Sequence, residues 1–176
     1  MGISATTPIN LLFGAGDLTV GGIDVGATKE GTVFRVEQEV YWPDLNCAKG
    51  PVTGTGYKIR EVAYLQVNLV EMTMENVALA IPCAAASSTV GAPHASTIIS
   101  GGIPGCIATT CYNDVVWTGA TCEPKTLRIT LKDAISSENM EITFQCDEEA
   151  SFTLTFMATY DPGNVTVRPW YMELEV

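Results

Sequence analysis

The sequence predicts a mainly β protein, an antiparallel β-sandwich or barrel with one short flanking α-helix. Apolar and polar side chains alternate with period two in several segments, which is typical of half-buried strands. Clusters of Gly, Pro, Asn and Asp separate these segments, and only one stretch has helical spacing. The 176 residues suit a single domain. A hydrophobic fraction of 47% with a charged fraction of 16% excludes intrinsic disorder.

The strands are predicted from the alternation. Residues 151–160 give the clearest case, because Phe152, Leu154, Phe156 and Ala158 alternate with Ser and Thr. The same period predicts strands at 32–42, 57–70, 126–132, 140–146 and 170–176. The side chains predicted to face the core there are Phe34, Val36, Val40, Ile59, Ala63, Leu65, Val67, Leu69, Leu127, Ile129, Leu131, Ile142, Phe144, Met172 and Leu174. Gly21-Gly22 predicts a tight hairpin turn between residues 18–20 and 23–25, since Gly tolerates positive φ.

One helix is predicted over residues 74–81. Thr73 can cap its N-terminus, and Pro82 ends it. Val77, Ala80 and Ile81 share one face at helical spacing, so we expect a short helix that lies on a sheet.

Two stretches, 43–56 and 83–110, are rich in small residues and have little periodicity, so we expect long loops. Residues 1–15 are interpreted as an N-terminal assembly arm and residues 16–176 as one sandwich domain. Leu11, Leu12 and Phe13 make the arm apolar, which suits contact with a partner subunit. The alternative, that this segment packs on its own core, stays open.

The charge balance excludes a protein that grips nucleic acid. Nine Lys and Arg stand against twenty Asp and Glu, which gives a net charge of −11. Neutralising phosphates requires clustered cations. No apolar run is long enough for a membrane-spanning helix, so we expect no membrane partner, and the N-terminus lacks the basic start of a secretory signal.

No catalytic constellation is present, so we expect a protein that is not an enzyme and has no cofactor and no metal. His94 is the sole histidine, and no nucleophile elbow or phosphate-binding glycine motif occurs. The run Asp147-Glu148-Glu149 is interpreted as a solvated turn and not a cation site.

Six cysteines stand at positions 47, 83, 106, 111, 122 and 146. Their spacing does not match a zinc site. We interpret them mainly as small buried residues and loop thiols, with a disulfide within Cys106, Cys111 and Cys122 as the alternative.

Four stretches, taken in order and spacing, resemble the major tail tube proteins of long-tailed bacteriophages and of phage-like particles. They are GDLTVGGIDVGATKEGTVFRVEQEV, AKGPVTGTGYKIREVAYLQVNLVEMTMENVALAI, TLRITLKDAISSENMEITF and ASFTLTFMATYDP. No single motif among them is diagnostic. The resemblance implies a tail tube fold, hexameric rings and stacking of the rings into a hollow tube through which the genome passes. Both contractile and non-contractile tails remain open.

The resemblance also implies where contacts lie. The loop after the Glu-rich strand would touch the next ring, and the N-terminal arm would reach an adjacent subunit. The candidate ring-stacking residues are Pro43, Asp44, Lys49, Pro51 and Thr53, and the arm candidates are Leu11, Leu12 and Phe13. Further implied partners are the tape measure, terminator and baseplate or tip proteins. The implied location is the virion tail, after assembly in the host cytoplasm.

A tube for DNA should repel DNA, and the acidic charge fits this requirement, because a lumen of like charge lets the duplex slide without binding. Candidate lumen residues on the polar strand faces are Glu37, Glu39, Glu61 and Glu141. Arg35, Lys58 and Arg60 would pair between subunits or lie on the outer wall. The alternative function is another self-assembling β-sandwich subunit, such as a capsid decoration protein or a pilus-like adhesin. A small hydrolase is disfavoured by the single histidine.

Overall fold

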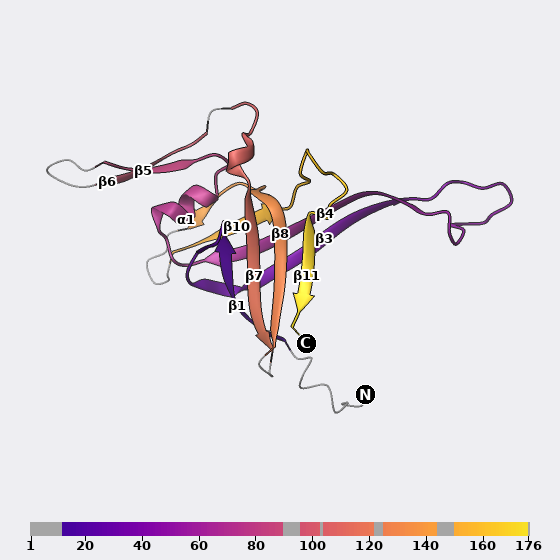
Figure 1. The fold of residues 1–176 in the computed structure, drawn as a ribbon, viewed down its shortest axis with the longest axis horizontal. Helices are drawn as coiled ribbons and strands as arrows, with labels where there is room; N and C mark the ends of the chain where they lie inside the picture. Colours follow the sequence, from indigo (N-terminus) through magenta and orange to yellow (C-terminus); the bar gives the residue numbers. More distant parts are fainter. Residues whose placement is uncertain (1–11, 90–95, 103, 122–124, 144–149, 176) are drawn as a thin grey trace.

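A computed structural model of the chain describes residues 12–89, 96–102, 104–121, 125–143 and 150–175 (Figure 1). Its elements are β1 (Leu12–Val20), β2 (Ile23–Asp24), β3 (Thr28–Tyr41), β4 (Tyr57–Leu69), α1 (Met74–Leu79), β5 (Ala85–Thr89), β6 (Ser96–Ser100), the 3-10 turn η2 (Thr109–Cys111), β7 (Asn113–Thr121), β8 (Thr126–Ser136), β9 (Ile142–Thr143), β10 (Ser151–Met157) and β11 (Trp170–Leu174). The mainly β class with one short helix is therefore confirmed. None of the described helices has the length and apolar character needed to cross a bilayer.

One curled antiparallel sheet of nine strands makes the body. Its path is β2-β1-β7-β8-β10-β4-β3, with β11 added to β8 and β9 added to β10. The front half contains β1, β2, β7, β8 and β11, and the back half contains β3, β4, β9 and β10. The strands of the two halves run across one another in Figure 1. The expected sandwich is thus one sheet folded over itself.

Strand β8 belongs to both halves, and a bulge in it makes this possible. It pairs with β11 up to Leu131 and with β7 up to Ala134, whereas its last residues, Ile135 and Ser136, pair with β10. The register between β7 and β8 shifts between Leu131 and Ala134, where Asp133 lies in the left-handed region at φ 45°. A bulge bends its strand and increases the local twist.

The Asp114 carboxylate on β7 holds this bulge from the side. Its Oδ2 accepts from Lys132 Nζ at 2.5 Å, and its Oδ1 accepts from the backbone N–H of Asp133 at 3.2 Å. The hydrogen bond to Asp114 raises the pKa of Lys132 above its usual value. On the other side, the Thr159 hydroxyl donates to the Asp133 carbonyl at 2.6 Å, and the Lys132 N–H donates to the Pro169 carbonyl at 2.7 Å.

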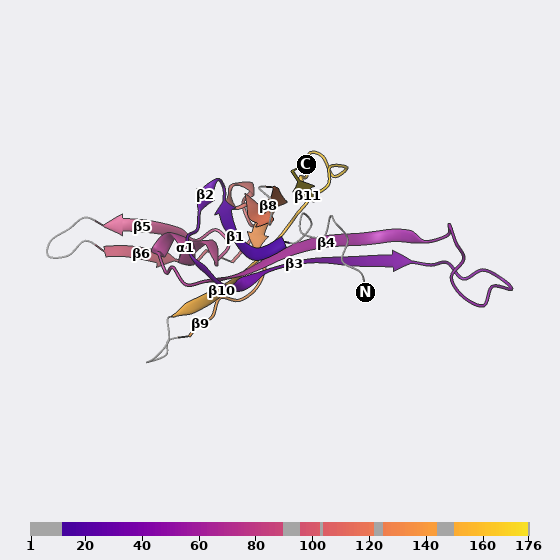
Figure 2. The same cartoon turned by 90° about the horizontal axis from the view of Figure 1, so that it is seen from below.

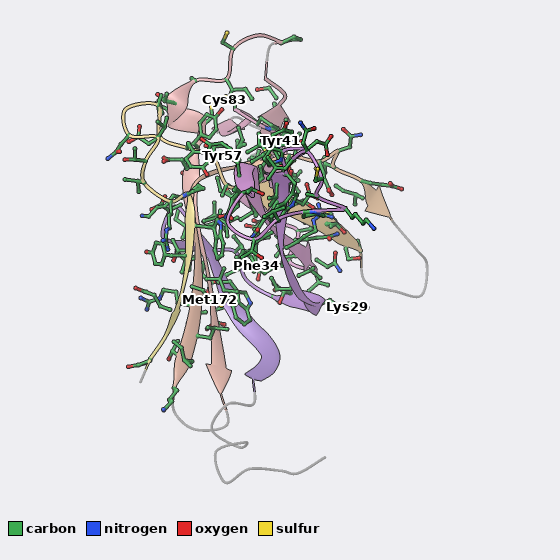
Figure 3. All side chains as sticks on the ribbon, turned by 90° about the vertical axis from the view of Figure 1, so that its right-hand side faces the viewer. Lys29, Phe34, Tyr41, Tyr57, Cys83 and Met172 are labelled. Atoms are coloured by element: carbon green, nitrogen blue, oxygen red, sulfur yellow. A yellow bond between two sulfur atoms is a disulfide. The ribbon has the colours of Figure 1, made fainter. Side chains whose placement is uncertain are left out.

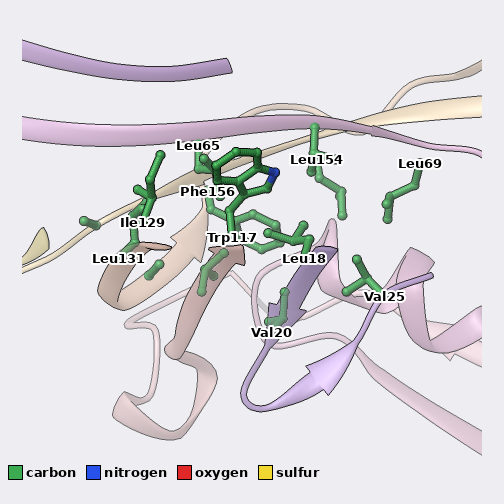
Figure 4. Packing of buried hydrophobic residues seen from close by; sticks show 14 of the residues in the cluster. Leu18, Val20, Val25, Leu65, Leu69, Trp117, Ile129, Leu131, Leu154 and Phe156 are labelled. Carbon is green, nitrogen blue, oxygen red and sulfur yellow. The ribbon is translucent and has the colours of Figure 1, made fainter. Parts of the chain in front are cut away.

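The hydrophobic core fills the space between the two halves (Figure 4). The front half contributes Leu18, Val20, Val115, Trp117, Leu127, Ile129 and Leu131, and the back half contributes Ala63, Leu65, Val67, Leu69, Phe152, Leu154 and Phe156. All of these side chains are buried, so the predicted core-facing residues are confirmed at 63–69, 127–131 and 152–158. Thr130 and Thr155, which were predicted to face outward, are buried as well. Phe144 lies outside the described residues.

Four side chains predicted to face the core are exposed instead. Val40, Ile59, Met172 and Leu174 lie where one half of the sheet extends beyond the other. A second bulge, where Val40 pairs with Lys58 and Glu39 pairs with Arg60, also shifts the alternation at Ile59. Alternation along a strand predicts a face but not whether that face is covered.

Helix α1 confirms the predicted cap and end. The Thr73 hydroxyl accepts from the Asn76 N–H at 3.1 Å, and the helix ends before Pro82. Val77 is buried against the core, and the buried Asn76 amide donates to the carbonyls of Val25 at 2.8 Å and Glu71 at 3.0 Å. The helix is shorter than expected, with six residues.

Two hairpins project from opposite ends of the body (Figures 1 and 2). The β3–β4 hairpin carries the loop 42–56 outward at one end. At the other end, β5 and β6 pair over five residues from Ala85 to Thr89 and from Ser96 to Ser100. The expectation of a long irregular loop over 83–110 is therefore wrong for these residues. Ladder hydrogen bonds form there although the sequence has no alternation.

A disulfide joins Cys83, just before β5, to Cys111 in η2. The alternative prediction was a disulfide within Cys106, Cys111 and Cys122. It is wrong for Cys111, because the partner of Cys111 is Cys83. Cys106 and Cys47 are exposed free thiols. Cys122 and Cys146 lie outside the described residues.

Trp117 occupies a notch made by two glycines that face each other on β1 and β7. Gly16 pairs with Gly119, and the Trp117 ring covers both. A Cβ added at Gly119 would lie 2.2 Å from the Trp117 ring, and one added at Gly16 would lie 2.6 Å from it. These glycines are required by packing and not by backbone conformation.

We predict that Asp114→Ala lowers the free energy of unfolding by about 1–2 kcal/mol, because it removes both acceptors that hold the β8 bulge, in a half-exposed site. Urea denaturation followed by circular dichroism measures this. The matched control is Asp17→Ala, an exposed acid on β1, for which we expect a change within about 0.5 kcal/mol. Equal losses in the two variants would contradict this role of Asp114.

We predict that Gly119→Ala destabilises the protein by about 1–3 kcal/mol, because the added methyl group overpacks the Trp117 notch. Thermal or urea denaturation measures the change. Gly101→Ala is the control, since a Cβ there meets open space, and its effect should stay within about 0.5 kcal/mol. A neutral Gly119→Ala would show that the notch can relax.

Candidate assembly surfaces

The outer face of the back half is polar and carries two of the four candidate lumen acids. Glu37 and Glu39 are exposed on β3, on the face that the alternation predicts. Arg35 Nε lies 3.4 Å from Glu37 Oε1, and the Arg35 guanidinium stacks 4.8 Å from the centre of the Tyr64 ring. An exposed pair of this kind contributes little to stability. The lumen role of both acids stays a prediction.

Glu61 lies elsewhere, on the inner face that it shares with Ala63 and Leu65, so its predicted place on the polar face is wrong. Its side chain is 17% exposed. Its Oε1 accepts from Trp170 Nε1 at 2.9 Å, and its Oε2 accepts from Lys58 Nζ. The hydrogen bond from Lys58 lowers the pKa of the Glu61 carboxyl, and the one from Trp170 adds to this. Glu61 therefore ties β4 to β11 across the two halves.

Glu141, the fourth candidate, is exposed immediately before β9. Strand β9 lies at the far side of the back half from the tip of the β3–β4 hairpin (Figure 2). The four acids thus do not form one surface patch.

The distal end of the β3–β4 hairpin exposes apolar side chains. Tyr57 is 71% exposed and Ile59 57%, and Tyr41 and Trp42 are also exposed (Figure 3). The Trp42 ring covers Gly56, where a Cβ would approach it within 2.8 Å. This contact closes the base of the loop.

The loop 43–56 contains all five candidate stacking residues. Asp44, Lys49, Pro51 and Thr53 are exposed, and Pro43 is half-buried. Two local turns shape the loop, with the Ala48 N–H donating to the Leu45 carbonyl at 3.1 Å and the Thr55 N–H to the Val52 carbonyl at 3.2 Å. The loop thus presents Leu45 and Val52, both exposed, beside the candidates.

The N-terminal candidates lie partly in the sheet. Leu12 and Phe13 belong to β1, where Leu12 pairs with Thr121, whereas Leu11 lies outside the described residues. Their contact with a neighbouring subunit and the division at residue 15 stay predictions.

A groove separates β11 from the β3–β4 hairpin. Cross-strand partners share a face, so Met172 and Leu174, opposite Ile129 and Leu127, continue the core face of the front half. Nothing in the described part covers them: Met172 is 49% exposed and Leu174 47%. The groove has a volume of about 750 Å³ and begins at Trp170, whose ring lies 5.3 Å from that of Phe34.

The sequence prediction missed this groove. Its strongest signal was the alternation that placed Met172 on an inner face. The positively charged residues Arg60 and Arg168 line the same groove, but they are 108 positions apart and only the pairing of distant strands brings them together. The periodicity along a single strand gives no information on which distant residues lie close together.

The described residues contain no group of His, Cys, Asp and Glu that is arranged to hold a metal ion. His94 and the run 147–149 lie outside the described residues.

We predict that Glu61→Gln lowers the free energy of unfolding near pH 7 by about 1 kcal/mol, because the variant loses the charge that accepts from Lys58. A lowered folded-state pKa stabilises the protein above the unfolded-state pKa, and this contribution disappears as pH falls through the folded-state pKa. The difference from wild type should therefore shrink as the pH falls below about 4.3, the ordinary pKa of a Glu carboxyl. Urea titrations at several pH values measure it.

The control is Glu39→Gln, an exposed acid without an ion pair in the described residues. Its difference from wild type should stay near zero at every pH. A constant difference for Glu61→Gln would contradict the assigned role of the Glu61 charge.

No family model matches the sequence, and no curated protein matches it. Two solved structures have a similar course of the chain. One is a chain of the sheath-tube complex of an extracellular contractile injection system, PVC, in its extended state, with a TM-score of 0.46, 9% identity and coverage of 99% of this chain and 100% of that chain. The other is the tube-terminating cap of the anti-feeding prophage, with a TM-score of 0.41, 10% identity and coverage of 90% and 87%. At this level neither similarity assigns the chain to a family.

Proposed function

We propose that this protein is a structural subunit that assembles into six-membered rings and that the rings stack into a hollow tail tube for a genome. The observation that carries the proposal is the β3–β4 hairpin, which extends beyond its own core and exposes aromatic and aliphatic side chains at its distal end. A subunit whose apolar surface is completed by a neighbour fits this shape.

The composition of the hairpin tip supports an interface. Monomeric proteins rarely expose contiguous apolar patches, and the centres of protein interfaces are enriched in Tyr and Trp. Tyr41, Trp42, Tyr57 and Ile59 are exposed within one short section of the hairpin. Together with Leu45 and Val52 of the loop, they would contact the next ring.

Free strand edges support lateral contact within a ring. In the described part, β3 pairs only with β4, and β11 pairs only with β8. Open edges of this length are templates for pairing with another chain unless they are covered. A contact between two different surfaces of identical copies closes into a ring when the rotation suits.

The charge supports a role as a wall for DNA. Glu37 and Glu39 are exposed on the long β3 strand of a chain with a net charge of −11. A surface of this sign facing the lumen would repel phosphates and leave the duplex free to slide. The proposal includes the further tail proteins as partners and the virion tail as the place of action, with no catalytic step.

Electron microscopy of the purified protein tests the proposal, and we expect hollow tubes or stacked rings with six-fold symmetry. The double variant Tyr57→Ser and Ile59→Ser should fold but give no stacks, because it removes the apolar hairpin tip. Ile23→Ser, which changes an equally exposed apolar residue on β2, is the matched control and should assemble normally.

Closed trimers would favour a capsid decoration protein, since a closed ring without stacking needs no distal contact. A monomer at every concentration, or stacks that form equally well without the hairpin side chains, would contradict the proposal.

A further inference from the structure

We infer that the groove between β11 and the β3–β4 hairpin binds a second copy of this chain, through the acidic connection between β8 and β9 of that copy. The inference rests on the proposed self-assembly and names the residues that would meet at one of its contacts.

The groove combines an apolar wall with two arginines that form no ion pair in the described part of the chain. Met172 and Ile59, both about half exposed, provide apolar surface, and Arg60 and Arg168 are among the residues that line the groove. Arginine beside apolar surface is typical of the centre of an interface.

Glu61 fixes this arrangement. It accepts from Trp170 Nε1 and from Lys58 Nζ, so its own charge is used inside the groove wall. The charge of Arg168 also acts on Glu61, but neither Arg168 nor Arg60 forms an ion pair with it, so both can pair with an anion of another molecule. They are notable in a chain with only nine Lys and Arg against twenty Asp and Glu.

The strongest anionic segment of the chain is the complement. Residues 133–167 contain seven carboxylates and no Lys or Arg. Glu138 and Glu141 are exposed in the β8–β9 connection, and Glu138 Oε2 accepts from the Thr155 hydroxyl at 2.7 Å, which anchors it at the edge of the back half.

The positions of the two surfaces suit contact between copies. The β8–β9 side and the β3–β4 hairpin point to opposite sides of the molecule in Figure 2, so one copy does not join its own surfaces. A contact of this kind is heterologous and propagates around a ring. Two copies of net charge −11 repel each other as a whole. A local contact between opposite charges would determine how the two copies are oriented when they meet.

A charge-exchange experiment tests the inference. One variant carries Arg60→Glu and Arg168→Glu, and the other carries Glu138→Lys and Glu141→Lys. Each alone brings like charges together, so the concentration needed for assembly should rise at least about tenfold. An equal mixture of the two should assemble again, since each reversed surface then meets a complementary one. A chain with all four changes should assemble alone.

Arg128→Glu is the control, because it reverses an exposed charge on β8 outside the groove. It should assemble like wild type, and circular dichroism should show that every variant folds. If wild type assembles and neither reversal impairs assembly, or if the mixture fails to restore it, the inference is wrong while the proposed function stands. If wild type forms no oligomer, the proposed function itself fails.

Adding duplex DNA to the wild-type protein tests whether the groove binds DNA phosphates and not the carboxylates of a second copy. We expect no binding, because the net charge repels phosphates beyond the groove. Binding that the Arg60→Glu and Arg168→Glu variant abolishes would identify the groove as a nucleic-acid site and overturn the inference.

Discussion

The bulge of β8, held by Asp114, is the constraint on which the architecture depends. One strand serves both halves of the sheet only if it changes direction between Leu131 and Ile135, and a left-handed residue at Asp133 provides the change. That backbone leaves N–H and carbonyl groups without ladder partners, and buried groups of this kind are costly unless they are paired. The Asp114 carboxylate, the Thr159 hydroxyl and the Pro169 carbonyl supply those pairs. The halves can then face each other across one core.

The turn in β8 also determines what the core does not cover. Strand β11 pairs only with residues 127–131 of β8. The core-facing side of β11 therefore extends beyond the side chains that the back half places opposite it. The β3–β4 hairpin, in turn, extends past the front half. The two overhangs make the groove and the exposed hairpin tip. The surfaces proposed for assembly are therefore a consequence of how the sheet folds over itself, and the apolar composition is shared between a core and its continuation at the surface.

Local patterns predicted the local structure well. The core-facing residues at 152–158 and 63–69, the Gly21-Gly22 turn and the Thr73 cap all depend on neighbouring residues, and all are confirmed. The predictions that failed concern contacts between residues that are far apart in the sequence. Glu61 finds Trp170 at a separation of 109 positions, and Cys83 finds Cys111 across a hairpin that has no alternation. Met172 shows the remaining limit, because its face was predicted correctly but not its exposure. Coverage depends on which half of the sheet lies opposite, and the sequence does not encode that locally.

The most direct test of the account compares hydrogen exchange in the monomer with exchange in the assembled particle. The core strands β7, β8 and β10 should be protected in both states, because their ladders lie inside the folded sheet. We predict that residues 41–59 and β11 gain protection only on assembly, as a neighbouring copy covers the hairpin tip and the groove. Equal exchange of these segments in the two states would contradict the claim that they are the surfaces through which the subunits assemble.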